Sequence, residues 1–230
     1  KYTYSTMAAE SYKGLPVFAH KGLHEYTETL VIESVPPAAR ILELGCGSGA
    51  FSRRLEDAGY YLTCCDMTAD YFVNWGSVSF VEADINDAFE TQIEGTFDAV
   101  IALEVIEHLE NPWQFMRRVL KLVRPGGTVV VSTPNIGSPR SVLSFVKNGT
   151  FKYFLDSDFA PGGHITPISQ LHLTKIIERA GFYNIRVESF GSPWGSGVRH
   201  LGAKLVSLLM KNNPTKIGVI SICIAERPEN

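Results

Sequence analysis

The chain has 230 residues, of which 45% are hydrophobic, and it carries 21 basic against 24 acidic residues. Its net charge of −3 at pH 7 lacks the basic excess that binding to a phosphate backbone normally needs, so the composition disfavours a nucleic-acid substrate. A chain of this length can bury about three quarters of its unfolded surface in one core without disulfides. We therefore expect a single domain.

The four cysteines are expected to be reduced thiols. They stand at positions 46, 64, 65 and 223, with one adjacent pair and no CxxC spacing, which does not suggest a disulfide framework. No apolar run reaches the roughly 20 residues of a membrane helix, and no signal-peptide core is visible near the first residue. The sequence thus predicts a cytoplasmic protein without a transmembrane segment.

Short apolar strands alternate with amphipathic helices over the first 135 residues. Apolar residues from Leu23 to Val35 indicate an N-terminal helix that ends at Pro36. Strands are then expected at 41–44, 61–66, 78–81, 97–103 and 128–132, and helices at 51–58 and from 112 to about 123. Alternation of this kind gives a parallel sheet with right-handed crossovers. The pattern predicts a doubly wound α/β fold.

The rhythm changes after residue 135. An aromatic connection follows the fifth strand, and it either lines an apolar substrate pocket or simply covers the sheet edge. Its aromatic residues are Phe145, Phe151, Tyr153, Phe154 and Phe159. A helix at 168–180 and strands at 184–190 and 218–225 complete the pattern. The insert 191–217 separates these last strands, and its helical spacing fits a helix packed on the core, a dimer face, a substrate lid or a membrane-surface helix.

A glycine-rich loop joins the first strand of the sheet to its helix. Gly45, Gly47 and Gly49 leave room for a ligand to approach the backbone at the edge where doubly wound folds bind ligands. Asp66 ends the second strand 21 positions after Gly45, where a carboxylate can accept the hydroxyl hydrogens of a ribose. The two features together indicate a cofactor that contains adenosine.

Two cofactor classes remain open on these features alone. Gly45, Gly47 and Ala50 also satisfy the dinucleotide pattern G-x-G-x-x-A, which suits a nicotinamide cofactor. Glu43 puts a carboxylate beside the loop, where it would repel a pyrophosphate but could accept from an amino-acid ammonium, directly or through water. Asp84 ends the third strand and could accept from an adenine amino group. These two carboxylates favour a cofactor with a cationic end and no phosphate.

Five segments of the chain resemble the motifs of the class I S-adenosylmethionine-dependent methyltransferases. They occur in the family's order, and the similarity is greatest to the subgroup of the ubiquinone-biosynthesis O-methyltransferases. The segments are ILELGCGSG at 41–49, CDM at 65–67, EADI at 82–85, FDAV through EVIEHL at 97–109, and the leucine at 122 through PGG at 125–127. The resemblance implies a seven-stranded sheet in the order 3-2-1-4-5-7-6, with the seventh strand antiparallel.

The resemblance also implies roles for individual residues. Gly45, Gly47 and Gly49, with Cys46 between them, would approach the methionine part of S-adenosylmethionine, and Asp66 would bind its ribose. Met67 would pack on the adenine, whose edge would contact Asp84 and Ile85, while Leu103 and Glu104 would lie beside the sulfonium. His20 precedes the N-terminal helix, and it is either a contact to the methionine carboxylate or an ordinary surface histidine.

Methyl transfer requires mainly the alignment of nucleophile, methyl carbon and sulfur, with removal of a proton from the acceptor. Glu104 and His108 are four residues apart and would share one side of a helix, and His164 follows a glycine pair. These three are the candidate catalytic residues. Alternatively, Glu107 caps or pairs locally and His108 only begins a turn.

We do not expect a bound metal, but four residues of the chain could hold a divalent ion. In the ubiquinone-pathway enzymes and the plant small-RNA 2′-O-methyltransferases, a similar E-x-x-E-H segment and a later histidine are proposed to hold a divalent ion. The corresponding candidates are Glu104, Glu107, His108 and His164.

We accordingly expect one methyltransferase domain with three parts: an N-terminal helical lid at 1–37, a cofactor-binding half at 38–135 and a substrate-side half at 136–230. The expected reaction moves a methyl group from S-adenosylmethionine to a small-molecule acceptor, at a hydroxyl oxygen, and releases S-adenosylhomocysteine. A nicotinamide oxidoreductase and a methyltransferase-like binding protein without turnover are the alternatives. The chain would act as a monomer or homodimer.

Overall fold

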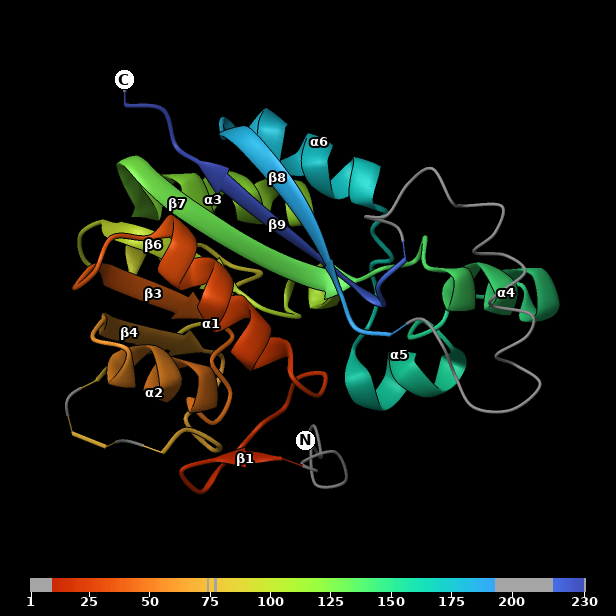
Figure 1. Ribbon diagram of the computed structural model, residues 1–230, viewed down its shortest axis with the longest axis horizontal. Coiled ribbons are helices and arrows are strands. Elements are labelled where there is room, and N and C mark those ends of the chain that lie inside the picture. Colours follow the sequence, from red (N-terminus) through yellow and green to blue (C-terminus); the bar gives the residue numbers. More distant parts are fainter. Residues whose placement is uncertain (1–9, 74, 77, 193–216, 230) are drawn as a thin grey trace.

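A computed structural model describes residues 10–73, 75–76, 78–192 and 217–229, which form three layers around one sheet (Figure 1). Helices α1 (Leu23–Ser34) and α2 (Ala50–Asp57) cover one face of the sheet. Helices α3 (Pro112–Leu122) and α6 (Gln170–Ala180) cover the other face. Two short 3₁₀ turns, η1 (Phe89–Thr91) and η2 (Ile106–His108), lie in the connections.

Seven strands form the main sheet of the described residues, in the order β5-β4-β3-β6-β7-β9-β8. Their bounds are β3 (Arg40–Leu44), β4 (Tyr61–Asp66), β5 (Ser79–Glu82), β6 (Phe97–Ala102), β7 (Val123–Pro134), β8 (Tyr183–Phe190) and β9 (Ile220–Glu226). Only β9 runs antiparallel to its neighbours in this sheet. If these seven strands are numbered 1 to 7 along the chain, their order in the sheet is 3-2-1-4-5-7-6, with the seventh strand antiparallel. The predicted fold is confirmed.

The fifth strand of the sheet, β7, is longer than the sequence predicts. It begins at Val123, directly after α3, and a register shift against β6 between Phe97 and Ala99 accommodates the additional residues. At its other end Thr133 and Pro134 pair with β9, which the apolar pattern of residues 128–132 could not indicate. The long strand carries the chain out to the carboxyl edge of the sheet.

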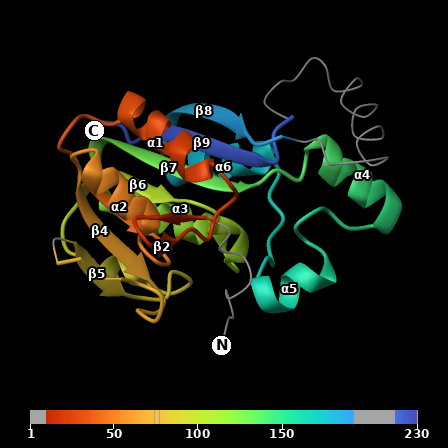
Figure 2. The ribbon, with the colours of Figure 1, turned by 60° about the horizontal axis from the view of Figure 1, so that its bottom comes forward.

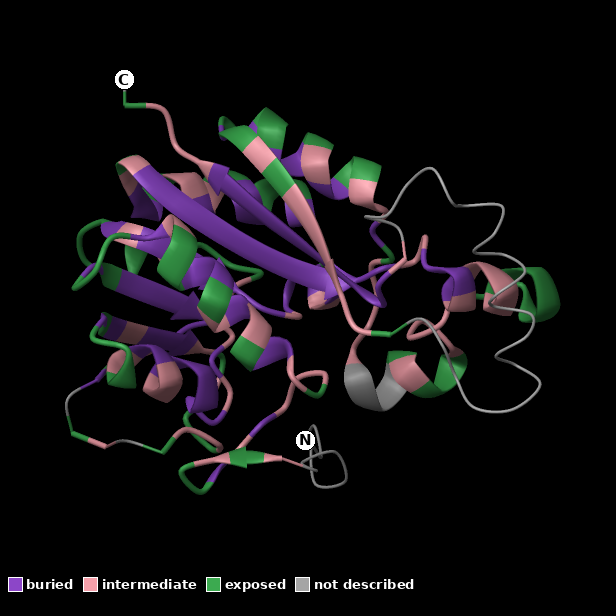
Figure 3. Ribbon diagram, viewed as in Figure 1, coloured by how far each residue is buried: buried purple, intermediate pink, exposed green. Residues whose placement is uncertain are grey.

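The core lies on both faces of the sheet (Figure 3). On the α3 and α6 side, Leu42 and Leu44 pack with Phe115 and Ile177, and on the α1 and α2 side Ile41 packs with the residues beneath those helices. The alternation of Leu42, Glu43 and Leu44 between the faces follows from the two-residue period of a strand. Because β3 is buried on both faces, its carboxyl end is fixed, and the loop that follows it is fixed as well.

Two helices, α4 (Pro139–Asn148) and α5 (Asp156–Gly162), extend beyond the carboxyl edge of the sheet (Figures 1 and 2). They belong to the predicted aromatic connection. The Phe145 and Phe151 rings stack with centroids 4.7 Å apart, and Phe145 and Phe159 remain about half exposed. Residues 193–216 lie outside the described part of the chain, so the alternatives for the insert 191–217 stay predictions.

A short hairpin of β1 (Ser11–Tyr12) and β2 (Leu15–Pro16) precedes α1. The Tyr12 hydroxyl donates to Asp57 at 2.8 Å, and the Ser48 hydroxyl donates to the Pro16 carbonyl at 2.6 Å. The N-terminal segment is thereby joined to α2 and to the glycine-rich loop. None of the helices in the described ranges has both the length and the apolar composition that crossing a bilayer would require.

Candidate active site

The glycine-rich loop turns tightly between β3 and α2. Gly45, Gly47 and Gly49 have φ values of 72°, 54° and 82°, a left-handed region that favours glycine. The amides of Gly45 and Cys46 donate to the Cys65 carbonyl at 2.8 and 3.2 Å, which holds the loop against the end of β4. The glycines of the motif thus adopt a backbone conformation that would be strained for residues with a side chain.

Asp66 joins this loop to the end of β4. Its Oδ2 atom accepts from the Gly47 amide and its Oδ1 atom accepts from the Met67 amide, both at 2.8 Å. Burial raises the pKa of the Asp66 carboxyl, against the opposing effect of these amide bonds. Each carboxylate oxygen has a second lone pair, so the group can still accept from ribose hydroxyls while it remains fixed in place.

Glu43 is buried beneath the glycine-rich loop, whereas the sequence suggested a charged carboxylate beside it. The side chain is 4% exposed and accepts from the Ser52 hydroxyl of α2, which the Cys64 thiol also contacts at 3.0 Å. Burial raises the pKa of Glu43 to about 8, so the carboxyl is mostly protonated at neutral pH. Its observed contact fixes α2 beneath the glycine-rich loop. A neutral carboxyl at this position would not repel a pyrophosphate, so the charge of Glu43 does not separate the two cofactor classes. Glu43 remains a predicted cofactor contact.

The residues predicted at the adenine lie along the ends of β4 and β5. Met67 is 55% exposed, so its side chain is accessible to a ligand. The Asp84 carboxylate accepts from the Asn86 amide at 2.9 Å and so fixes the turn after β5. Ile85 packs against the core on the α3 side. These positions are compatible with adenine contacts, which remain predictions.

Aromatic side chains pack against the glycine-rich loop at positions that no sequence motif indicated. A Cβ atom built on Gly47 would lie 3.1 Å from the Phe18 ring, and one on Gly49 would lie 2.8 Å from the Trp75 ring. Phe18 also meets Tyr71 edge to face, with ring centroids 5.9 Å apart. No local pattern links these residues to the loop, because the contacts join segments about 30 residues apart on either side of it.

His20 and Leu103 are two further residues that were predicted to contact the cofactor. His20 lies just before α1, with its ring 5.9 Å from Phe190 and its Nδ1 atom 3.2 Å from the Lys21 carbonyl oxygen. Leu103 follows β6 and is 9% exposed, within the core of the α1 side. His20 and Leu103 therefore remain predicted cofactor contacts, each fixed by neighbours that the sequence did not indicate.

Glu104 adopts a strained conformation at the end of β6. Its φ of 54° is unusual for a residue with a side chain, and its amide donates to the Ser132 hydroxyl at 2.9 Å. That hydroxyl in turn donates to Oε1 of Glu104, also at 2.9 Å. Burial raises the pKa of Glu104 to about 7, against the opposing hydrogen bond from Ser132. The carboxyl therefore gains and loses a proton near neutral pH.

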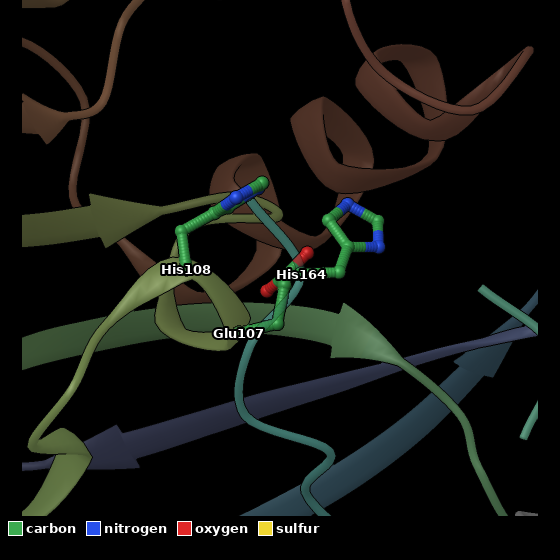
Figure 4. A group of neighbouring side chains, drawn as sticks. All are labelled: Glu107, His108 and His164. Atoms are coloured by element: carbon green, nitrogen blue, oxygen red, sulfur yellow. The ribbon is translucent and has the colours of Figure 1, made fainter. Parts of the chain in front are cut away.

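A cluster of Glu107, His108 and His164 lies next to Glu104 (Figure 4). One potential ligand atom from each of the three lies within 4.8 Å of the others. The two imidazole rings meet edge to face, with centroids 4.7 Å apart. Glu104 is not a member of this group. The four-residue spacing of Glu104 and His108 assumed a helix, whereas the chain forms the 3₁₀ turn η2. Of the four predicted metal candidates, Glu107, His108 and His164 lie together.

Glu107 is fully buried, and neither of its carboxylate oxygens has a hydrogen-bond partner among the described residues. Burial raises its pKa well above the usual range, and the charge of Glu104 adds to the effect. The nearby Thr133 hydroxyl opposes this rise in the pKa, but its oxygen also has no hydrogen-bond partner among the described residues. A buried carboxylate normally has partners. The cluster therefore contains unsatisfied oxygen atoms that a cation or a donor could fill.

Backbone hydrogen bonds bring His164 to this cluster from far along the chain. The amides of Ile165 and Thr166 donate to the Glu107 carbonyl at 3.0 and 2.9 Å. The Nδ1 atom of His164 lies 2.7 Å from the Tyr153 carbonyl oxygen. His108 and His164, which the family resemblance grouped as candidates, are thus neighbours in space.

The family model of the methyltransferase domain matches residues 18–187, well over half of the chain. The chain belongs to the methyltransferase domain family. The resemblance inferred from the five motifs is thereby confirmed, and the matched range includes every residue of the site described above.

Individual relatives and structures agree with this assignment. The methyltransferase domain is 32% identical over 107 residues to the ubiquinone biosynthesis O-methyltransferase of Xanthomonas campestris, over 43% of this chain and 44% of that protein. The match thus spans less than half of that relative's length. A SAM-dependent methyltransferase structure from Archaeoglobus fulgidus aligns with a TM-score of 0.61 at 19% identity, over 89% of this chain and 94% of that chain.

A second structure is similar in fold. It is phosphoethanolamine N-methyltransferase 2 of Haemonchus contortus in complex with S-adenosyl-L-methionine, with a TM-score of 0.63 at 14% identity, over 92% of this chain and 54% of that chain. At such identities the two structures support the fold of the methyltransferase domain and leave its acceptor undetermined.

Proposed function

We propose that this methyltransferase domain transfers a methyl group from S-adenosylmethionine to a hydroxyl oxygen of a small-molecule acceptor. The observation that carries the proposal is the fixed pair of Gly47 and Asp66 at the carboxyl edge of a class I methyltransferase sheet. The similarity to the ubiquinone biosynthesis O-methyltransferase of Xanthomonas campestris supports oxygen as the acceptor atom.

The geometry suits a reaction that needs alignment more than chemical assistance. The cofactor residues lie after β3, β4 and β5, and Glu104 with the cluster of Glu107, His108 and His164 lies after the adjacent strand β6. An acceptor held at the cluster would face a methyl group presented from the glycine-rich loop. His108 or Glu104 would take up the proton that the acceptor hydroxyl loses.

The cluster also has the donor set for a divalent cation. One carboxylate and two imidazoles, with open positions for substrate oxygens, suit such an ion, and the unsatisfied oxygens of Glu107 are the feature that fits it. We propose that Glu107, His108 and His164 hold the ion, which would orient hydroxyl oxygens and lower the pKa of the attacking one. His164 would bind through Nε2, because Nδ1 is directed to the Tyr153 carbonyl.

The test measures S-adenosylhomocysteine and methylated product with a panel of phenols that includes vicinal diols. The proposal predicts turnover with at least one hydroxyl acceptor and none with matched thiols or amines. Treatment with EDTA should abolish turnover, and added Mg²⁺ or Mn²⁺ should restore it. Turnover that persists in EDTA would remove the metal and leave His108 as the candidate base. Methylation of only amines or thiols would overturn the assignment of oxygen.

A further inference from the structure

Helices α3 and α6 present two matching stripes of side chains to solvent. On α3 the stripe is Trp113, Arg117 and Lys121, and on α6 it is Leu171, Lys175 and Arg179. Each stripe follows the four-residue spacing of one helix face. The helices run in the same direction, because each leads into a strand, β7 or β8, and β9 is antiparallel to both of these strands. The apolar ends of the stripes therefore lie together, and the basic residues lie beyond them.

The stripes border an open hollow of about 620 Å³. Its lining residues are Trp113, Arg117, Leu171, His172, Lys175 and Arg179. Trp113 is 39% exposed and Leu171 is 66% exposed, so apolar surface remains in contact with solvent at one end of the hollow. None of these residues belongs to the candidate active site.

The charges at the hollow are poorly balanced. Arg117 and Arg179 form no ion pair with any residue in the described ranges, whereas Arg53, Arg54 and Arg118 each pair with a carboxylate. Lys175 pairs with Glu178 at 2.6 Å, and the charge of Arg179 also acts on that carboxylate. Lys175 and Arg179 thus share one carboxylate, and Arg117 has no ion-pair partner among the described residues, in a chain whose net charge is −3. Mutual repulsion of unpaired cations on one surface favours a bound anion.

We propose that this hollow binds a phosphate ester, with its phosphate on Arg117, Lys175 and Arg179 and its apolar part against Trp113 and Leu171. Guanidinium groups match phosphate oxygens in pairs, and a lysine adds a further charge. An indole face can pack on a ring or an aliphatic chain. The phosphate can belong to a soluble ester or to a phospholipid headgroup, and the test separates these sources.

The first arm of the test titrates the whole chain with phenyl phosphate and with inorganic phosphate by calorimetry at low salt. The inference predicts that phenyl phosphate binds more tightly than inorganic phosphate, since only the ester has an apolar part. The double substitution Arg117→Gln with Arg179→Gln should weaken binding at least about tenfold, the scale of a lost charged hydrogen bond. Lys147→Gln, at an exposed lysine of α4, is the matched control and should leave binding unchanged.

The second arm measures co-sedimentation with vesicles of phosphatidylcholine alone and with 30% phosphatidylglycerol added. Binding to the mixed vesicles that the double substitution removes would assign the phosphate to a lipid headgroup. Binding of phenyl phosphate without vesicle binding would assign it to a soluble ester. If neither probe binds, or if the double substitution binds as well as the control, the hollow is not a phosphate site. Circular dichroism verifies that each variant is folded.

Discussion

His164 directs its Nδ1 atom at the Tyr153 carbonyl oxygen, 2.7 Å away. A carbonyl oxygen only accepts, so Nδ1 carries the proton and the lone pair of Nε2 is available. Tyr153 itself has a φ of 72°, which is strained for a residue with a side chain. The chain thus maintains an unfavourable backbone conformation at the residue that fixes the tautomer and orientation of a candidate ligand.

The first prediction separates the two nitrogen atoms of His164. In His164→Asn the amide NH₂ can replace Nδ1 as donor to Tyr153, but nothing replaces Nε2. We expect a melting temperature within about 3 °C of the wild type, because the partly buried hydrogen bond to Tyr153 is kept. We also expect loss of Mn²⁺ binding, measured by calorimetry. A variant that binds Mn²⁺ as the wild type does would show that His164 is not a ligand.

The second prediction concerns Asp66. Asp66→Asn keeps the shape of the side chain but removes the charge, and it places a donor where a hydroxyl hydrogen should point. We expect the affinity for S-adenosylmethionine to fall by about 1.5 to 3 kcal/mol, the scale of hydrogen bonds to a charged group. Calorimetry compares it with Glu33→Gln, the same change at an exposed residue of α1, which should bind normally. Equal affinities in the two variants would remove Asp66 from the cofactor site.

The third prediction tests whether cofactor binding needs the space beside Gly47 as well as the backbone conformation of the glycine-rich loop. Gly47→Val should abolish cofactor binding, since its φ is 54° and an added Cβ would already lie 3.1 Å from Phe18. Gly59→Ala is the matched control, because Gly59 has a φ of 94° but nothing within 4 Å of an added Cβ. It should cost about 1 kcal/mol of stability and leave cofactor affinity intact. Normal binding by Gly47→Val would make the loop a structural turn.

The fourth prediction follows from the raised pKa of Glu43, which is about 8. The folded chain keeps this proton, whereas the unfolded chain loses it near pH 4.5, so the folded chain binds more protons between these values. Stability should therefore fall as pH rises through this window. In Glu43→Gln that contribution, roughly 4 kcal/mol between pH 4.5 and 8, should disappear.

Urea unfolding at pH 5 and pH 8 provides the measurement for Glu43. The loss of stability between the two pH values should be smaller in Glu43→Gln than in the wild type, while Glu33→Gln should lose as much as the wild type. Burial also raises the pKa values of Glu104 and Glu107. Every variant therefore keeps the part of the pH dependence of stability that comes from these two groups. An identical pH dependence in Glu43→Gln and the wild type would show that Glu43 ionises normally.

The sequence predicted those parts of the site that local geometry determines. Strand ends, positive φ angles and a carboxylate after a strand are encoded within a few residues, so Gly45, Gly47 and Asp66 could be placed before the fold was known. The order of the sheet followed from the family resemblance. Asn111, which directly precedes Pro112, caps α3 by accepting from the Gln114 amide at 3.0 Å, and this cap is also a local feature of the sequence.

Contacts between distant segments could not be predicted in this way. Phe18 lies against Gly47, and Tyr153 holds His164, through packing that no periodicity in the sequence reports. The helical spacing assumed for Glu104 and His108 is absent for a related reason. A four-residue spacing has meaning only in a helix, and the left-handed conformation of Glu104 ends that regularity just after β6.

In the proposed function, the glycine-rich loop and Asp66 hold S-adenosylmethionine and not a nicotinamide dinucleotide. Calorimetric titration of the whole chain with S-adenosylmethionine, S-adenosylhomocysteine and NADH tests it directly, without knowledge of the acceptor. We predict saturable binding of the first two at one site per chain, weakened by Asp66→Asn, and no binding of NADH. Binding of NADH with no binding of S-adenosylmethionine, in folded protein, would contradict the proposed function.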